Sequence, residues 1–241
     1  MRRWLAVAVA LALAACHSSR NTEQAFLDEV GAQSKEQIMA RGDALAAKKK
    51  WEEARKYYTF LSDTFPNDPI GRRATLKVAD SFFALADTEG YTEAQLRYKD
   101  FSNRFPSDPS RAYALLMLAK CSFKQHKGPL RDLTPLHEAT DSLKQMLQLF
   151  PNSPYAPEAK TMLAKCLEEL AQHEFLIAKY YANVQAWVGA KQRLDYLFEN
   201  YPETATAATA KPLMAKVEER LAPRPLVSPT TSEKAKSAAQ H

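Results

Sequence analysis

Four prolines divide the chain into segments that repeat one spacing of apolar residues. An aromatic residue comes directly before each proline, and an alanine stands twelve positions before it. The prolines are Pro66, Pro106, Pro151 and Pro202, and the alanines are Ala54, Ala94, Ala139 and Ala190. Another alanine follows each proline by eight positions. A period that recurs four times is typical of an array of stacked repeats that share one core.

Each repeat predicts a helix, a turn that a proline closes, and the start of a second helix. In the first copy, the apolar positions Trp51, Ala54, Tyr58 and Leu61 are three or four residues apart, so they lie on one face of a helix. The alanine on that face lets another helix approach closely. Pro66 then ends the helix, because proline lacks the N–H group and disfavours a helical conformation in the residue before it.

The sequence as a whole predicts an all-α fold. Only six of the 241 residues are glycine, and no segment alternates apolar and polar residues as a strand does. The first copy, from Ile38 and Gly42 to Pro66, reproduces the tetratricopeptide repeat of about 34 residues. We therefore expect a superhelical array of antiparallel helix pairs, a tetratricopeptide-like solenoid of four to five repeats.

The amino terminus has the pattern of a bacterial lipoprotein signal. Arg2 and Arg3 precede an apolar run, Trp4 to Ala14, that is too short to span a bilayer. The run ends in Leu-Ala-Ala-Cys, which resembles a lipobox and implies cleavage before Cys16 and a lipid on its sulfur. An ordinary signal peptide with a chance cysteine is the alternative. His17 after the cysteine favours sorting to the outer membrane.

These features predict four segments: a signal peptide at 1–15, a lipidated tether at 16–33, the repeat domain at 34–221 and a disordered tail at 222–241. The distances between successive prolines are 40, 45 and 51 residues, so residues are inserted between the helices of the later copies. We expect insertions at 87–90 and in a loop at 127–134. One long helix is predicted from Ala156 to about Asn183, and a closing helix from about Thr206 to Leu221.

Charge and reactive side chains argue against several classes of function. Without residues 1–15 the chain has 31 basic residues, two fewer than the full 33, against 28 acidic ones, and no basic stripe suggests nucleic acid binding. No nucleophile elbow, catalytic triad order or phosphate loop is present, so we predict no enzyme activity and no cofactor. His137-Glu138 and His173-Glu174 lack the second histidine of a zinc-protease helix. Cys121 and Cys166 are best explained as buried packing residues, with a disulfide as the lesser alternative.

An array of this kind offers a concave surface that binds an extended segment or a helix. The first helices of the repeats should line it, and the candidate substrate-binding residues there are Lys77, Asp80, Phe83, Tyr113 and Lys120. The alternative is that these side chains belong to ordinary core or surface.

Residues 173–214 resemble the BamD family, the tetratricopeptide lipoproteins of the outer-membrane β-barrel assembly machinery. The residues that carry the resemblance are Glu174, Ala178, Tyr180-Tyr181, Ala186-Trp187, Arg193, Tyr201-Pro202, Thr204 and Pro212-Leu213-Met214. The segment from Tyr180-Tyr181 to Trp187 is the most specific part. Upstream, Arg131-Asp132 and residues 150–155 are also similar, and the resemblance extends over residues 34–221. Where the family often has Arg-Gly before the Ala-aromatic pair, this chain has Val184-Gln185.

The resemblance implies an outer-membrane lipoprotein that faces the periplasm and supports barrel folding and insertion. Its amino-terminal repeats would receive unfolded outer-membrane protein segments, and its carboxy-terminal repeats would dock a BamA-like barrel protein, beside other lipoproteins of the complex. On that basis Arg193, Tyr180, Tyr181 and Trp187 are the candidate partner-binding residues. The alternative is a periplasmic repeat scaffold for cell division or peptidoglycan association, which would not be expected to share the segment from Tyr180 to Trp187.

Overall fold

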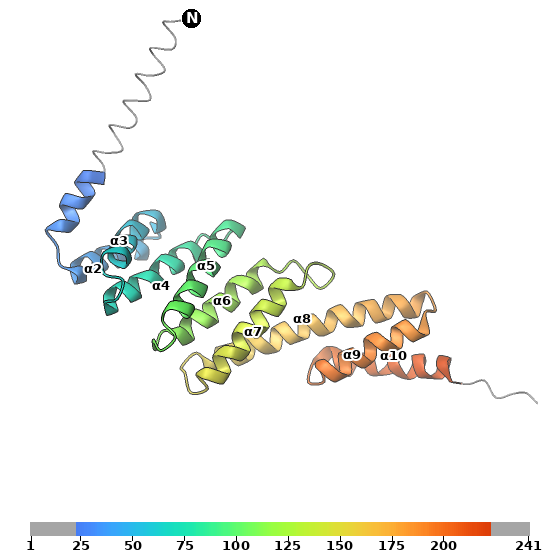
Figure 1. Cartoon of the computed structure of the whole chain (residues 1–241). Helices are drawn as coiled ribbons and strands as arrows, with labels where there is room; N and C mark the ends of the chain where they lie inside the picture. The colour runs from blue at the N-terminus through green and yellow to red at the C-terminus, as the bar shows by residue number, and fades with distance from the viewer. Residues whose placement is uncertain (1–22, 223–241) are drawn as a thin grey trace, which may run out of the picture. The chain divides into compact units, whose positions relative to one another are not determined.

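The computed structural model describes residues 23–222, and every regular element in that range is a helix (Figure 1). Within residues 35–125 and within residues 187–221, consecutive helices pack against each other, as in a tetratricopeptide-like array. The predicted all-α fold is therefore confirmed. The predicted signal peptide, the lipid attachment at Cys16 and residues 223–241 of the predicted tail lie outside the described residues.

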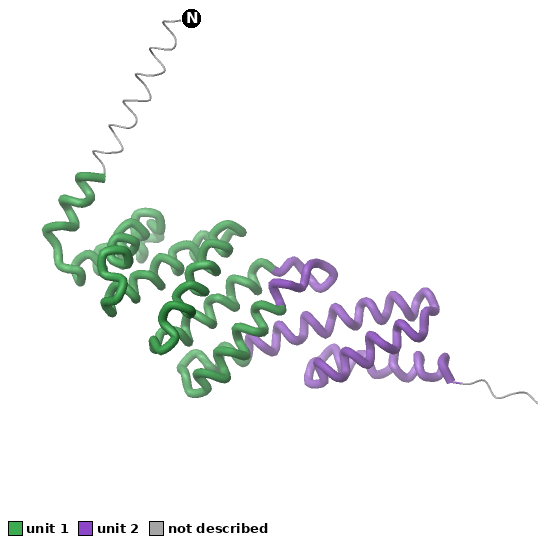
Figure 2. Tube along the Cα trace, in the orientation of Figure 1, with its two compact units in different colours: residues 1–125, 137–160 green, residues 126–136, 161–241 purple. Residues whose placement is uncertain are grey.

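The described chain forms two compact units (Figure 2). The first holds residues up to 125 and residues 137–160, and the second holds residues 126–136 and those from 161 onward. The helices of the first unit are residues 23–31, α2 (Lys35–Ala47), α3 (Trp51–Thr64), α4 (Pro69–Phe83), α5 (Thr88–Arg104), α6 (Arg111–Gln125) and most of α7 (Thr134–Leu149). The second unit contains most of α8 (Ala156–Asn183), together with α9 (Trp187–Asn200) and α10 (Ala205–Leu221).

Local sequence signals set the helix ends. The side chains of Ser34, Asp68, Asp87 and Thr204 cap α2, α4, α5 and α10 by accepting hydrogen bonds from backbone N–H groups in the first turn. At the other ends, α3, α5, α7 and α9 each stop two residues before one of the four repeated prolines. This agreement confirms that the prolines close the helices.

The repeated alanines occupy the interior of the array. Ala54, Ala94, Ala139 and Ala190 are all 0% exposed, as are Ala74, Ala114, Ala159 and Ala210, which follow the prolines. In the first unit, large residues surround these small ones: one core cluster contains Tyr58 and Leu61, and a second contains Tyr98 and Phe101. The predicted packing of helices through alanine positions is thus confirmed.

The structure corrects the predicted tether. Residues 23–31 form a helix that belongs to the fold. Its Phe26 ring lies edge-on to Tyr57 at 5.2 Å, its Val30 is buried in the first core cluster, and its Glu29 accepts a hydrogen bond of 3.1 Å from the Tyr57 hydroxyl. Two apolar residues four positions apart are enough to hold this helix against the fold, because α3 supplies an aromatic surface on which they pack. Residues 16–22 of the predicted tether lie outside the described range.

The insertions between helices take different forms. In the second copy, the insertion expected at 87–90 belongs to a helix, because Asp87 caps α5 and Thr88 to Gly90 form its first turn. In the third copy, residues 126–133 contain no helix, which confirms an insertion loop there. In the fourth copy, α8 runs without a break for 28 residues, or about 40 Å, as predicted.

The two cysteines within the array are packing residues. Both Cys121 and Cys166 are buried, and Cys121 forms no disulfide bond. Burial, with a further contribution from the nearby Asp80, raises the pKa of the Cys121 thiol to about 12. The packing interpretation is confirmed for Cys121.

Candidate functional site

The partner-binding candidate Arg193 joins α9 to α8. Its Nη1 atom donates a hydrogen bond of 3.1 Å to Oε2 of Glu174. The Glu174 side chain is only 9% exposed, whereas that of Arg193 is 42% exposed. A buried carboxylate is costly unless it is paired, so the guanidinium stabilises Glu174 while part of it still faces solvent. Arg193 therefore has a structural role in addition to any contact with a partner.

Reversing the charge of Arg193 should test that structural role. Arg193→Glu leaves the buried Glu174 without its cation and adds a like charge, so we expect the free energy of unfolding to fall by about 3 kcal/mol. Denaturant unfolding followed by circular dichroism measures this change. Glu174→Gln combined with Arg193→Gln removes both charges and should recover most of the loss.

The matched control is Lys191→Glu, which reverses a cation on the same helix. Lys191 pairs with Asp195 at 2.9 Å, but both side chains are well exposed to solvent. Water screens this pair, and the control should change stability little. Equal losses for Arg193→Glu and Lys191→Glu would contradict the role assigned to Arg193.

The other three partner-binding candidates lie near the turn between α8 and α9. The Tyr180 side chain is 63% exposed, and its ring centroid is 6.0 Å from that of Tyr181. Tyr181 packs over Gly189, where an added Cβ would lie 3.4 Å from the tyrosine ring. Trp187 is half-buried, and the guanidinium of Arg220 lies 5.8 Å from the centre of its ring. Tyr180 is thus the most accessible of the four.

Two exposed valines near the same turn were not among the predicted residues. Val184 is 55% exposed and Val188 is 62% exposed, so with Tyr180 they are three exposed apolar residues at the end of α8, in the turn and at the start of α9. Exposed apolar side chains that lie close together mark interaction sites more often than single ones do. Their spacing in the sequence could not have indicated this group, because the chain turns between α8 and α9 and the period of one helix does not apply. We call Tyr180, Val184 and Val188 the turn patch.

The turn itself depends on a left-handed residue. Gln185 has φ 59°, and its N–H donates to the carbonyl of Ala182 at 3.1 Å. The N–H of Ala186 donates to the carbonyl of Tyr181 at 2.9 Å, which completes a Schellman motif at the end of α8. Glycine is the usual residue at such a position, because it has no Cβ to resist positive φ. Gln185 therefore adopts the backbone conformation that the turn requires, and the positive φ strains its backbone.

Gln185→Gly should relieve that strain. We expect the free energy of unfolding to rise by about 0.5–1 kcal/mol, because glycine reaches positive φ without a steric penalty. Denaturant titration measures the change. Gln192→Gly, at an exposed position inside α9, is the control and should lose about 1 kcal/mol. A loss of stability at both positions would show that the turn is not strained.

The substrate-binding candidates Asp80 and Tyr113 are brought together by the structure. Asp80 Oδ1 accepts hydrogen bonds from the hydroxyls of Tyr98 at 2.6 Å and Tyr113 at 2.7 Å. Burial raises the pKa of both tyrosines well above the ordinary value, and the Asp80 carboxylate raises it further, so both hydroxyls stay protonated and donate. The three side chains form a link between α4, α5 and α6.

A sequence signal for this link exists and was missed. In the first repeat the Tyr58 hydroxyl donates to Asp43 at 2.8 Å, and Asp43 follows the small Gly42 as Asp80 follows Ala79. Tyr58 and Tyr98 both stand eight positions before their prolines. In the third repeat, Lys120 stands at the position of the aspartate and Leu143 at the position of the tyrosine, so both members of the pair are replaced. This joint change indicates a pair in contact rather than two separate binding residues.

The remaining substrate-binding candidates also contact neighbouring helices. Lys77 Nζ is 3.7 Å from Asp43 Oδ1, and Lys120 Nζ is 2.7 Å from Glu158 Oε1. The Phe83 ring lies 5.3 Å from that of Tyr91. All five candidates are half-buried and have a partner within the chain. Their role in substrate binding stays a prediction.

Residues 23–222 contain no candidate for a membrane-spanning helix or for a metal site. No helix among them combines the length and apolar character that crossing a membrane requires. No three histidine, cysteine or acidic side chains in this part of the chain gather into a potential metal site.

Comparison with known proteins places this chain in a family. Residues 31–232 match the family described as YfiO, outer membrane lipoprotein, and this range includes all of α2 to α10. The chain belongs to that family. The relatives are BamD proteins, which confirms the resemblance predicted from residues 173–214. All nine candidate binding residues lie inside the matched range.

Individual BamD proteins match over much of their length. The chain is 28% identical to the outer membrane protein assembly factor BamD of Haemophilus influenzae over 226 residues, which cover 89% of this chain and 82% of that protein. It is 24% identical to BamD of Neisseria gonorrhoeae over 210 residues, covering 83% of this chain and 77% of the relative. A shorter match to BamD of Pasteurella multocida is 35% identical over 91 residues, or 38% of this chain and 35% of that protein.

Proposed function

We propose that this chain is an outer-membrane protein assembly factor. It is anchored by a lipid on Cys16, faces the periplasm, docks a BamA-like barrel protein and binds unfolded outer-membrane protein segments. Membership of the outer membrane lipoprotein family, with BamD relatives that cover most of the chain, is the observation that carries this proposal. Other lipoproteins of the assembly complex are further expected partners.

The second unit is the proposed docking site for the BamA-like protein. The turn patch exposes one aromatic and two aliphatic side chains, and Arg193 adds a cation that is only half-buried. Tyrosine and arginine are enriched among the residues that dominate binding energy, especially where apolar contact and hydrogen bonding occur together. The long α8 and the Schellman motif that ends it hold this turn in a defined geometry.

Polar substitution in the turn patch should weaken docking while the fold is retained. We expect Tyr180→Ser combined with Val188→Ser to weaken binding of the purified mature chain to the periplasmic domains of the BamA-like protein by about tenfold or more. Both side chains are exposed, so their loss should leave the melting temperature close to that of the wild type. Titration calorimetry measures the binding, with Glu199→Ser, also exposed on α9, as the control.

The binding results test the location of the docking site and the proposed function separately. If the double variant binds as tightly as the control, the patch is not the docking site. If the wild-type chain itself fails to bind the barrel protein, the proposed function loses its main partner.

A further inference from the structure

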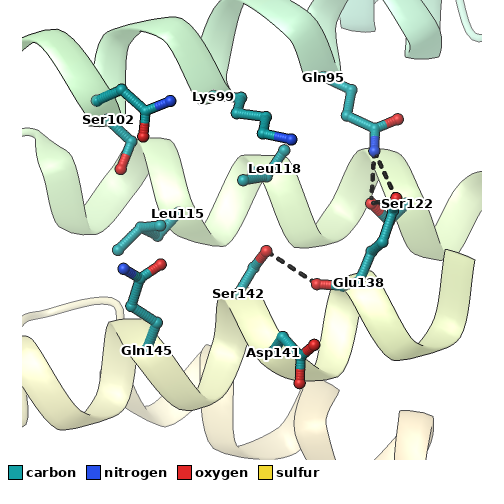
Figure 3. Close-up of a pocket in the computed structure, with 11 residues that line it drawn as sticks. Gln95, Lys99, Ser102, Leu115, Leu118, Ser122, Glu138, Asp141, Ser142 and Gln145 are labelled. Atoms are coloured by element: carbon teal, nitrogen blue, oxygen red, sulfur yellow. Dashed lines mark hydrogen bonds between the residues drawn. The ribbon is translucent and has the colours of Figure 1, made fainter.

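A groove of about 460 Å³ lies within the first unit, between α5, α6 and α7 (Figure 3). Leu115 and Leu118 of α6 form its floor. Side chains of α5 and α7 form its two walls, and both helices are second helices of their repeats. The substrate-binding candidates Lys77 to Lys120 are on the first helices α4 and α6, and none of them lines this groove.

One end of the groove is held by a hydrogen-bond network. Gln95 Nε2 donates to Ser122 Oγ at 3.1 Å and to Glu138 Oε2 at 2.8 Å, as the dashed lines in Figure 3 show. Gln95 Oε1 accepts a hydrogen bond from Gln125 Nε2 at 2.6 Å, so the nitrogen and the oxygen of the Gln95 amide both form hydrogen bonds. This network joins α5, α6 and α7 and fixes the separation of the walls.

The other end of the groove has unused polar side chains. Asn103 and Lys99 on α5 and Gln145 and Asp141 on α7 are exposed, and none of them forms a hydrogen bond or ion pair with another residue in 23–222. The two amides each offer a donor and an acceptor, and they stand on opposite walls. Below them lie the apolar side chains of the floor.

An equivalent groove between the preceding helices shows what distinguishes this one. It lies between α3, α4 and α5, with Asp63 at the position of Asn103 and Asp100 at the position of Gln145, counted from the prolines. There both carboxylates have a partner, because Arg104 Nη1 donates to Asp100 Oδ2 at 3.2 Å and Ser62 Oγ donates to Asp63 Oδ1 at 3.2 Å. The two equivalent positions therefore hold carboxylates with hydrogen-bond partners in one repeat and, within residues 23–222, amides without such partners in the next.

We infer that the groove between α5 and α7 binds an extended segment of an unfolded outer-membrane precursor. The inference rests on the proposed function and names a second contact surface for its substrate. An extended main chain presents one donor and one acceptor per residue, which matches the amides of Asn103 and Gln145. Barrel strands alternate apolar and polar side chains, so every second side chain is apolar and can lie on the half-buried Leu118, below which Leu115 is buried.

The charge of the groove argues against an anionic ligand. Glu138 and Asp141 line the α7 wall, and Lys99 is the one cation among the lining residues. Lipid headgroups and nucleic acids carry phosphates, which two carboxylates beside one lysine disfavour. A peptide segment without net charge meets no such repulsion.

Fluorescence anisotropy with the purified mature chain tests the inference. The probe is a labelled synthetic peptide of about ten residues, the length of one barrel strand, with alternating apolar and polar residues. We expect Asn103→Ala combined with Gln145→Ala to raise the Kd about tenfold, the effect of losing two hydrogen bonds. The control is Lys144→Ala combined with Gln148→Ala, which alters two exposed positions on α7 outside the groove and should leave the Kd unchanged.

Two altered peptides test the kind of recognition. One has the same composition with its apolar residues contiguous, and the other carries N-methyl groups on alternate main-chain nitrogens. Both should bind the wild-type chain about tenfold more weakly, because the first loses the alternation and the second loses main-chain donors. Equal binding of all three peptides would overturn the inference.

The result also separates the groove from the proposed function. If the alternating peptide binds the wild type and the groove variant equally, the groove is not the site, while precursor binding by the chain stands. If the peptide does not bind the wild-type chain at all, the groove inference and the proposed precursor binding both fail.

Discussion

Loss of Cys16 is expected to move the protein from the membrane fraction to the soluble periplasm. Each methylene of a lipid chain that enters the bilayer contributes about 0.8 kcal/mol, and more than one acyl chain gives stable anchoring. None of the helices in the described range is long and apolar enough to replace that anchor. The chain without its lipid should therefore be released.

The experiment needs two forms of the change. Cys16→Ala blocks lipid attachment but can leave the apolar run from Trp4 to Ala14 uncleaved. A second form therefore replaces residues 1–16 with an ordinary cleavable secretory signal, and Ser18→Ala serves as the control with an intact lipobox. Fractionation after an alkaline wash, which removes proteins held only by partners, measures the anchor. Persistence of the second form in the washed membranes would contradict the lipid anchor.

Ala139→Trp is expected to cause a large loss of stability. Ala139 is 0% exposed in the middle of α7, so an indole has no space unless the helices move apart. Overfilling a packed core typically costs 1–3 kcal/mol, and this change of size should reach about 3 kcal/mol. Urea unfolding followed by circular dichroism measures the loss.

Lys144→Trp provides the control for this substitution. Lys144 is exposed on the same helix, so the same side chain can extend into solvent there. Its effect on the free energy of unfolding should stay within about 0.5 kcal/mol. If both tryptophan variants melt at the wild-type temperature, the alanine positions do not mark close contacts between helices.

The repeat spacing allowed much of the fold to be predicted. Small residues such as Ala54 and Ala139 recur at fixed distances from prolines, and both kinds of residue act locally: proline ends a helix and alanine permits close approach. The length of α8 was predictable for a similar reason, because no glycine or proline interrupts its apolar period after Pro157.

The repeat spacing could not predict two local structures that depend on tertiary contacts, the helix at 23–31 and the first turn of α5. Phe26 and Val30 are too few to indicate a stable helix, and they become buried only because α3 presents Tyr57 and Phe60 to the helix at 23–31. The repeat spacing predicted an insertion at 87–90 but not that its residues are helical. Here the aspartate caps α5 and the glycine fits against the Phe82 carbonyl.

Binding residues were also hard to predict, because the sequence does not show which side chains are exposed to solvent. Asp80 and Tyr113 are chemically suitable for binding, yet the structure commits both to a hydrogen-bond network within the chain. Val184 and Val188 resemble core residues in the sequence, and only the structure shows them in solvent. Asn103 and Gln145 belong to different repeats, so their shared groove becomes visible only after the helices are packed.

Affinity purification of the lipidated chain from detergent-solubilised envelope tests the central claim most directly. The proposed function predicts that a BamA-like barrel protein is recovered with the wild-type chain, and that the yield falls for the Tyr180→Ser and Val188→Ser double variant. Recovery of peptidoglycan-associated or cell-division proteins without the BamA-like protein would contradict the proposal and favour a periplasmic scaffold of another kind.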